Sequence, residues 1–244
     1  MASMNIAIVG AGRAGTSFDA ALRAVGHHVT LVHHDDLPVA FDASLDLVIL
    51  AVPDDAIAAV AARLVLSAPT VLAHLSGARG RDVLRAHPRV GSLHPLAILT
   101  DPSVGATRMH GGVFAVAGDE LLYEVVASLD GRVVEVSEER RVLYHATAVA
   151  AANHVVALMA HVEILAHGVG LDLADFLPLA RQALDDVAAL GPQAALTGPV
   201  ARGDVATIKA HLAAVPEAER STYAALAQRA QAIVERAVEV SWNV

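Results

Sequence analysis

A glycine-rich hexapeptide near the start of the chain is the clearest candidate for chemistry. Gly10, Gly12 and Gly15 have the spacing GxGxxG, directly after an apolar run and at the start of a helical pattern. In such a loop the first glycine permits a tight turn, the second lets the backbone approach a pyrophosphate, and the third packs the helix against the strand. The helix N-terminus would supply N–H groups to the phosphates. We predict a dinucleotide site that also includes Arg13 and Ala14; a plain turn is the alternative.

The end of the second predicted strand should distinguish NADP from NAD. NAD sites usually place a carboxylate there for the ribose hydroxyls, whereas this chain has His33 and His34. Arg13 in the glycine loop could reach a 2′-phosphate, so NADP is the favoured cofactor. In the alternative, the two histidines are exposed loop residues and Asp35 binds the ribose of NAD. Two further cofactor contacts are expected at the end of the third predicted strand, Val52 and Pro53.

Four polar residues are candidates for catalysis of a hydride transfer. Reduction of a C=O or C=N bond leaves negative charge on oxygen or nitrogen, which a proton donor or hydrogen bond must meet. His145 could donate, because histidine titrates near neutrality. His94 and Ser76 follow predicted strands at the edge where open sheets bind ligands, and Asn153 could border the same cleft. Structural roles are the alternatives: a bond to a nearby carbonyl for His145, a strand-end contact for His94, a turn for Ser76 and an interdomain hydrogen bond for Asn153.

A segment before the predicted helix at Asp204 is the candidate for substrate binding. Helix N-terminal N–H groups and Arg202 could hold a substrate carboxylate. In the alternative, the segment is a capped loop in which Asp204 is only the N-cap and Arg202 is solvated. The residues expected to contact substrate are Thr197, Gly198, Arg202 and Thr207.

Two further histidines do not indicate a metal site. His154 and His161 are seven residues apart and share a helix face, but no carboxylate stands at metal-ligand spacing from them. We predict no metal, and we expect these histidines in the core or at a dimer interface.

The elements that must position these residues alternate between strand and helix in the first part of the chain. Short apolar runs predict buried strands of a parallel sheet, at residues 5–9, 29–32, 45–52, 70–74, 90–93, 113–117 and 133–136. Helical patterns lie between them, at residues 16–25, 54–66, 80–86 and 119–129. This alternation predicts an α/β fold with a doubly wound Rossmann sheet.

The second part of the chain has no convincing strand pattern. Helices are predicted at residues 141–166, 173–190, 204–215 and 217–240, with a loop at 191–203. Ser137 could be the N-cap of the first of them. We therefore predict a dinucleotide-binding Rossmann domain over residues 1–137 and an all-α substrate and dimerisation domain over residues 138–244.

Composition excludes several classes of protein. The 244 residues include no cysteine, which excludes disulfides and a cysteine nucleophile. The net charge is −9 and aromatic residues make up 3%, so we expect no nucleic-acid partner. The longest apolar stretch, residues 146–160, is shorter than the ~20 residues of a membrane span, and no signal peptide is recognised. We therefore expect a cytoplasmic protein that acts without a membrane.

Four segments together resemble a known family. They are the GAGRAG loop at residues 10–15, Leu-His-Pro-Leu at 93–96, the stretch at 144–154, and Leu-Thr-Gly-Pro-Val-Ala-Arg-Gly-Asp at 196–204. The chain resembles the Rossmann-like DUF2520 proteins, relatives of pyrroline-5-carboxylate, ketopantoate and β-hydroxyacid reductases. The resemblance implies a helical domain like the C-terminal part of 6-phosphogluconate dehydrogenase, a nicotinamide cofactor in the cleft between the domains, and a homodimer formed through the helices.

One departure from these relatives concerns the proton donor. β-Hydroxyacid dehydrogenases place a catalytic lysine on the first helix of the second domain, an asparagine four residues later, and a Gly-Leu-Asp turn after the helix. Residues 170–172 resemble that turn, and counting back puts His145 in place of the lysine and Val149 in place of the asparagine. The only lysine, Lys209, lies far along the chain. His145 is therefore the expected substitute.

These observations predict an NADP-dependent oxidoreductase that reduces a small carbonyl or imine substrate bearing a carboxylate. By the resemblance, a ketopantoate-like keto acid is one such substrate. A dinucleotide-binding sensor or scaffold without catalysis is the main alternative, because the lysine and asparagine are missing. A helical interaction module with a vestigial Rossmann half is less favoured, since the glycine loop is intact.

Overall fold

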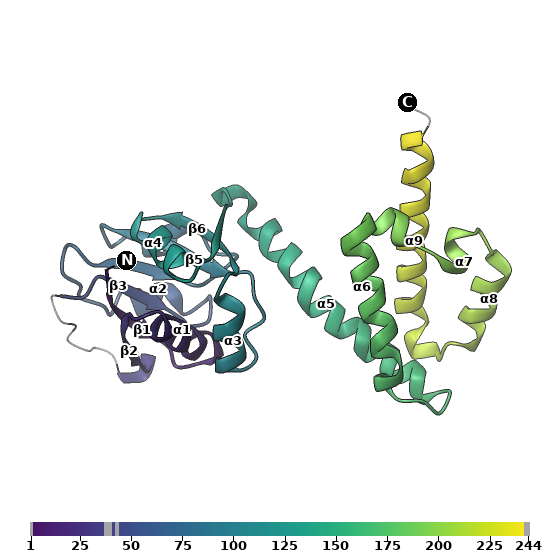
Figure 1. Cartoon of the computed structure of the whole chain (residues 1–244), viewed down its shortest axis with the longest axis horizontal. Coiled ribbons are helices and arrows are strands. Elements are labelled where there is room, and N and C mark those ends of the chain that lie inside the picture. The colour runs from purple at the N-terminus through teal and green to yellow at the C-terminus, as the bar shows by residue number, and fades with distance from the viewer. Residues whose placement is uncertain (1, 37–40, 42–43, 242–244) are drawn as a thin grey trace. The chain divides into compact units, whose positions relative to one another are not determined.

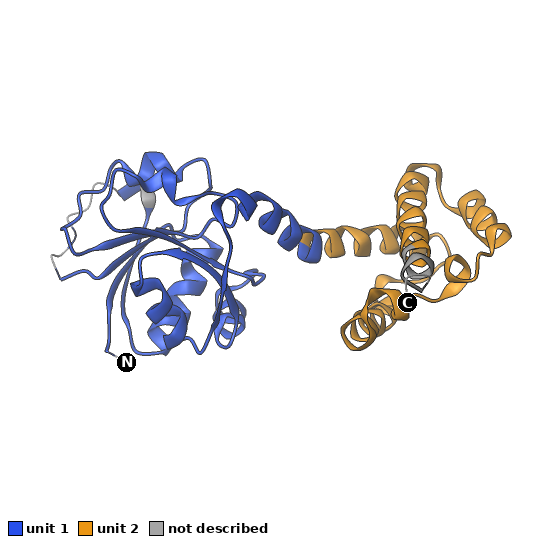
Figure 2. Ribbon diagram, turned by 90° about the horizontal axis from the view of Figure 1, so that it is seen from above, with its two compact units in different colours: residues 1–152 blue, residues 153–244 orange. Residues whose placement is uncertain are grey.

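The computed structural model describes residues 2–36, 41 and 44–241, which alternate between strand and helix and then continue as helices (Figure 1). Two compact units form, Met1–Ala152 and Asn153–Val244, blue and orange in Figure 2. The long helix α5 (Arg141–His167) begins in unit 1 and ends in unit 2. The predicted boundary near Ser137 marks the end of the last strand, whereas the two units divide within α5.

Unit 1 contains a seven-stranded sheet in the order β2-β1-β3-β4-β5-β6-β7. Neighbouring strands are parallel except for the antiparallel pair β5 and β6. The strands are β1 (Asn5–Val9), β2 (His28–Val32), β3 (Leu47–Leu50), β4 (Val71–His74), β5 (Val90–Pro95), β6 (Val113–Gly118) and β7 (Arg132–Glu135). β2 and β3 lie on opposite sides of β1, which creates a topological switch point beside β1. The predicted α/β class, a Rossmann-like sheet followed by helices, is confirmed.

The helices of unit 1 differ from the predicted ones in three places. They are α1 (Arg13–Ala24), α2 (Ile57–Ala61), α3 (Pro102–Met109) and α4 (Leu121–Ser128), with 3₁₀ turns η1 (His34–Asp36), η2 (Arg81–Leu84) and η3 (Glu138–Arg140). The helix predicted over residues 54–66 is shorter, because the N–H groups of Arg63 and Leu64 bond three residues back rather than four. The helix predicted around residues 80–86 is the 3₁₀ turn η2. α3 was not predicted, although Asp101 caps it by accepting the N–H groups of Ser103 and Val104.

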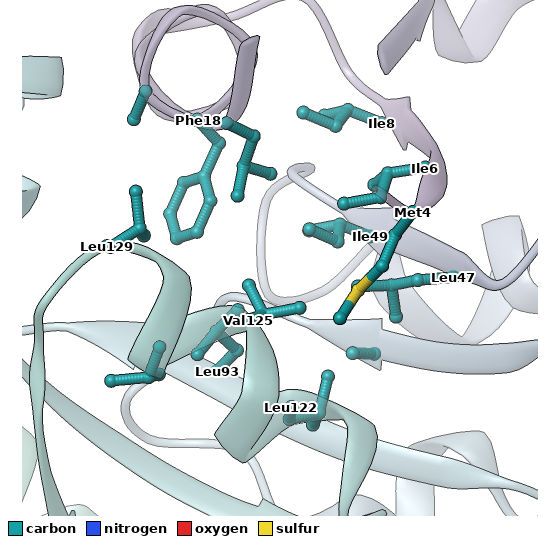
Figure 3. Packing of buried hydrophobic residues seen from close by; sticks show 14 of the residues in the cluster. Met4, Ile6, Ile8, Phe18, Leu47, Ile49, Leu93, Leu122, Val125 and Leu129 are labelled. Atoms are coloured by element: carbon teal, nitrogen blue, oxygen red, sulfur yellow. The ribbon is translucent and has the colours of Figure 1, made fainter. Parts of the chain in front are cut away.

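Apolar side chains cover both faces of the sheet. On one face Phe18 of α1 and Val125 of α4 pack against Ile8 and Leu47 of the strands, as the close view in Figure 3 shows. The rings of Phe18 and Phe114 meet edge to face, with centroids 6.5 Å apart. On the opposite face a second cluster includes Val9, Leu50, Ile57, Leu72 and Leu84. These two clusters fix the positions of the strands, and thereby of the loops that follow them.

The described residues of unit 2 are arranged in helices and their connections. After the second part of α5 come α6 (Leu173–Ala195), α7 (Gly198–Ala201), α8 (Val205–Ala214), the 3₁₀ turn η4 (Glu217–Glu219) and α9 (Arg220–Ser241). The loop predicted over residues 191–203 is therefore wrong in part. Gly191 has a non-helical backbone with φ 78°, and Pro192 directly after it opens a further helical stretch, a position that proline tolerates.

Unit 2 buries few of its side chains. Among its described residues, only His161, Ala166 and Val215 are buried. The segment Glu138–His167 is long and apolar enough to cross a membrane by length and composition, a test that the core helices of soluble proteins also pass. The expectation of no such segment considered only the apolar stretch at residues 146–160, which Asn153 and His154 interrupt, whereas Glu138–His167 as a whole meets these two criteria.

Candidate active site

The glycine loop follows β1 and opens α1, and its three glycines have different surroundings. A Cβ on Gly10, whose φ is 114°, would lie 2.3 Å from the carbonyl oxygen of Ala51, and a Cβ on Gly15 would lie 1.8 Å from the carbonyl oxygen of Gly10. A Cβ on Gly12 would meet nothing within 4 Å. The first and third glycines thus allow the tight turn and the close packing, and the second leaves room for an approaching group. These residues fit the pyrophosphate of a dinucleotide.

The start of α1 also has the electrostatic character that an anion needs. Gly12 is the N-cap, no side chain caps the helix, and the first turn has no acidic residue. The positive end of the helix dipole is therefore not offset by a carboxylate of this turn. Arg13, the first residue of the helix, is exposed.

The other predicted cofactor contacts lie at the carboxyl ends of the strands beside β1. His33 follows β2 and is exposed, as is Asp35, while the side chain of His34 lies outside the described residues. Val52 and Pro53 follow β3, and Cγ1 of Val52 would lie 3.2 Å from a Cβ on Gly10. The strand order therefore brings the residues after β1, β2 and β3 to one edge, beside the switch point.

A second group of polar side chains lies on one face of the sheet at β4 and β5. His74 pairs with Ser92 in the ladder, and His94 follows Ser92 by two residues, so all three side chains are on the same face. His74 and Ser92 are fully buried, and His94 is half-buried. This face is thus apolar beneath α2 and polar beneath the start of α5.

Arg141, the first residue of α5, lies within this polar interior. Its side chain is 1% exposed. Nε donates to the carbonyl oxygen of Arg79 at 2.8 Å, and Nη2 donates to Oγ of Ser92 at 2.7 Å and to the carbonyl oxygen of Ser76 at 3.4 Å. Burial lowers the pKa of Arg141 from its usual value, and the nearby negative charge of Glu138 acts in the opposite direction. Arg141 therefore joins α5 to β5 and to the loop after β4.

Two histidines and a tyrosine meet next to that loop. Nδ1 of His94 and the hydroxyl of Tyr144 are 2.8 Å apart, and their rings are perpendicular. The ring centroids of His94 and His145 are 5.9 Å apart. A Cβ on Gly77 would lie 2.8 Å from Nε2 of His94 and 2.8 Å from Cδ2 of His145. Only a residue without a side chain lets both imidazoles approach the backbone at this point.

Burial keeps two of the histidines neutral. It lowers the pKa of His74 to about 4, although a hydrogen bond to the carbonyl of Gly80 acts in the opposite direction. Burial also lowers the pKa of His94 to about 4, with smaller contributions of the same sign from His145 and Arg141. At neutral pH His94 is therefore a neutral imidazole, which cannot serve as an imidazolium donor.

The hydroxyl of Ser76 is engaged within its own loop. It donates to Oδ2 of Asp54 at 2.7 Å and accepts the N–H groups of Ala78 and Arg79, at 3.2 and 2.9 Å. The backbone N–H of Ser76 donates to Nδ1 of His74 at 3.2 Å. Ser76 therefore shapes the turn that carries Gly77, and Asp54 links this turn to the segment after β3.

The remaining predicted site residues lie in unit 2. Asn153 is exposed, as are Thr197 and Arg202, and Gly198 has a φ of 87°. Thr207 donates its N–H and its hydroxyl to the carboxylate of Asp204, at 3.0 and 2.7 Å. The N-terminus of α8 is thus capped by the protein's own carboxylate. The structure brings His145, His94 and Ser76 together within unit 1, and these other residues belong to a separate unit.

Five residues of the polar group were not predicted from the sequence: Asp54, His74, Ser92, Arg141 and Tyr144. Two signals could have indicated some of them. Arg141, Tyr144 and His145 have the i, i+3, i+4 spacing of one helix face. In β5 the alternation of Ser92, Leu93 and His94 indicates one polar and one apolar face.

The comparisons with known proteins agree with this architecture. Residues 114–230 match the family model described as a domain of unknown function, DUF2520. The chain contains a DUF2520 domain. The DUF2520 domain begins within β6 and ends within α9, so it includes Tyr144 and His145 but not the glycine loop. The predicted resemblance to this family is confirmed. No protein with a curated description matches the sequence.

Solved structures resemble nearly the whole chain. Protein BF3122 of Bacteroides fragilis, described as a "putative NADP oxidoreductase", is 22% identical, with a TM-score of 0.80 over 94% of this chain and 98% of its own. A reductive aminase of Aspergillus terreus solved with NADPH4, cyclohexanone and allyl amine is 18% identical, with a TM-score of 0.65 over 98% and 94%. The 1-pyrroline-5-carboxylate reductase of Streptococcus pyogenes is 14% identical, with a TM-score of 0.63 over 94% and 99%. The likeness at these identities establishes the fold.

Proposed function

We propose that this DUF2520 protein is an NADP-dependent reductase of a small carbonyl or imine, with His145 as the proton donor. The fold is that of NADP-dependent reductases, among them enzymes solved with NADPH. Two features of the chain itself support the proposal. They are a glycine loop that fits a pyrophosphate and a pair of imidazoles at the same edge of the sheet.

The observation that carries the proposal is a continuous series of contacts between these two features. The carbonyl oxygen of Ala51, which follows β3, packs so closely on Gly10 of the glycine loop that a Cβ there would lie 2.3 Å from it. Asp54, three residues later, accepts the hydroxyl of Ser76 after β4. The next residue is Gly77, where a Cβ would lie 2.8 Å from the ring of His94 and 2.8 Å from the ring of His145. One short segment after β3 thus joins the dinucleotide loop to the candidate donor. A dinucleotide-binding scaffold without catalysis would not require such a connection.

The chemistry requires one proton for each substrate reduced. NADPH, when bound, supplies a hydride to the carbon of the C=O or C=N bond, and the heteroatom takes up a proton. His145 is half-buried and its ring lies against Gly77. A protonated His145 can donate to the heteroatom, and solvent then restores its proton. Lys209, the only lysine, lies on α8 of unit 2 and has no part in this scheme.

The preference for NADP rests on the charges around the adenosine end. Arg13 at the start of α1 and His33 directly after β2 are exposed, where a 2′-phosphate would need hydrogen-bond donors or positive charge. Within unit 2, Arg202 is exposed and stays the candidate partner for an anionic group. The start of α8 is less suited to it, because the carboxylate of Asp204 already occupies that position.

We also propose a homodimer built on the helices of unit 2. Large apolar side chains are exposed along these helices, among them Val156, Ile164, Leu179, Leu184, Val187 and Leu190. Only three of the described residues of unit 2 are buried, so its own packing does not cover these apolar faces. They are in contact with water unless another protein surface covers them. A second copy of the same chain provides apolar helices of equal length.

Calorimetric titration with NADPH and NADH tests the cofactor, and NADPH absorbance with a panel of keto acids and cyclic imines tests the reaction. We expect tighter binding of NADPH, and turnover that His145→Ala lowers about 10²–10⁴-fold while NADPH binding persists. His167→Ala, an exposed histidine at the end of the same helix, is the matched control and should leave turnover unchanged.

Two outcomes would contradict the proposal. Tighter binding of NADH would move the ribose contact to Asp35 and remove the NADP assignment. Binding of NADPH without turnover across the panel would favour a sensor or scaffold.

A further inference from the structure

The contact between Tyr144 and His94 has a defined geometry. The hydroxyl oxygen lies 2.8 Å from Nδ1, the ring centroids are 5.5 Å apart, and the rings are inclined by 86°. Tyr144 stands on α5 and His94 near the end of β5, 50 residues apart in sequence. Such a contact constrains the orientation of the imidazole and also decides which of its nitrogens carries the proton.

The direction of this hydrogen bond follows from the acidity of the two groups. Neutral imidazole has one N–H donor and one nitrogen lone pair, and that lone pair is a much better acceptor than a phenol oxygen. The phenol is in turn the better donor. Tyr144 therefore donates to Nδ1, and the proton of the neutral ring is on Nε2. Nε2 is the atom of His94 that faces Gly77, next to the ring of His145.

We propose that Tyr144 is a positioning residue that holds His94 in the Nε2–H tautomer, so that a neutral N–H donor stands beside His145. The proposal rests on the proposed reductase function, because the acceptor is the carbonyl oxygen or imine nitrogen of its substrate. His94 and His145 then have separate roles. His94 donates a hydrogen bond to the heteroatom and keeps its proton, whereas His145 gives its proton up.

The surroundings of His94 favour a donor that remains uncharged. Arg141, from α5, is a buried cation on the same face of the sheet, and His74 is a neighbour from β4. His145 approaches from α5, and Asp54 is the carboxylate whose charge acts in the opposite direction. Together with burial, these groups lower the pKa of His94 to about 4. A neutral imidazole N–H is an established way to polarise a carbonyl without an ionised side chain.

Tyr144→Phe removes the hydroxyl and keeps the ring that packs on His94. ¹⁵N NMR of histidine-labelled protein, with His94 assigned by its loss in His94→Gln, reports the tautomer directly and needs no substrate. We expect protonated Nε2 and an accepting Nδ1 in the wild type, and a mixture of both tautomers in Tyr144→Phe. An Nδ1–H tautomer in the wild type, or an unchanged tautomer in Tyr144→Phe, would overturn the proposal.

Tyr223→Phe is a closely matched control. The hydroxyl of Tyr223 lies 2.7 Å from Nδ1 of His211, and their rings are inclined by 90°, but this pair is exposed and lies in unit 2. We expect this variant to leave the His94 signals and turnover unchanged. A loss equal to that of Tyr144→Phe would mean that the effect is not specific to His94.

With a reducible substrate in hand, Tyr144→Phe should lower kcat about 10-fold and leave the affinity for NADPH unchanged, because one oriented hydrogen bond is lost. Equal kcat in wild type and variant would contradict the donor role of His94, even if the tautomer changes. If the tautomer follows the prediction but no substrate is reduced, the proposed function fails while the assignment of Tyr144 stands. The two proposals are thereby tested separately.

Discussion

Replacing His74 should change how the stability of unit 1 depends on pH. His74 is fully buried, and its pKa is lowered from 6.5 to about 4. The unfolded chain binds a proton at this residue below pH 6.5, whereas the folded chain stays neutral down to about pH 4. Above pH 6.5 both states are neutral and the residue has no effect; below about pH 4 both are protonated. Stability is therefore lost as the pH falls between these values.

The magnitude follows from the two pKa values. Between pH 7.5 and 5, one such histidine should lower the free energy of unfolding by about 2 kcal/mol. His74→Gln can keep both hydrogen bonds of the ring, to the N–H of Ser76 and to the carbonyl of Gly80, but it does not titrate. At pH 7.5, where the histidine is neutral in both states, we expect the stability of the variant to differ from that of the wild type by no more than about 1–2 kcal/mol, the worth of an imperfect hydrogen bond. Between pH 7.5 and 5, the free energy of unfolding should fall by about 2 kcal/mol less in the variant than in the wild type.

Urea unfolding followed by the amide NMR signals of β4 and β5 measures this effect for unit 1 alone. His110→Gln, at a histidine that is 60% exposed, is the control, and its pH dependence should follow that of the wild type. Parallel pH dependences for the wild type and His74→Gln between pH 5 and 7.5 would refute the reasoning. In that case burial would not keep His74 neutral, and the same argument for His94 would fail with it.

Two other predictions concern the glycine loop and the assembly. Gly12→Val should fold normally but lose NADPH binding measured by calorimetry, because its side chain enters the open space before α1. Gly15→Val should unfold at lower urea concentration than the wild type, because even a Cβ would lie 1.8 Å from the carbonyl oxygen of Gly10. Equal NADPH affinity in Gly12→Val and wild type would exclude this loop as the phosphate site. Light scattering should give twice the chain mass of 25.2 kDa at micromolar concentration, and a monomer mass would remove the proposed dimer.

The sheet could be predicted because its signals are local. Most strands of the sheet contain a short apolar run, and the glycine spacing fixes where the first strand turns into the first helix. The helices at residues 54–66 and 80–86 were predicted too long. In both segments the sequence favours a helix, but the hydrogen bonds are those of 3₁₀ turns after residue 61 and over Arg81–Leu84. Gly191 and Pro192 indicated a break, but not that helix would resume after it.

The polar interior could be predicted only in part, because it depends on long-range contacts. His145 and His94 stood out as histidines at a helix start and a strand end. Arg141 did not, because a charged residue after Glu138 and Glu139 is typical of an exposed helix start. Its burial follows from acceptors that are distant in sequence, the loop carbonyls after β4 and the hydroxyl of Ser92.

Deuteride transfer tests the central claim most directly. The wild type would be incubated with NADPH deuterated at C4 and the panel of keto acids and cyclic imines, and the products analysed by mass spectrometry. A reductase should yield a product with one deuterium on the reduced carbon, and His145→Ala should form that product about 10²–10⁴-fold more slowly. Tight binding of NADPH with no deuterated product from any compound of the panel would contradict the account.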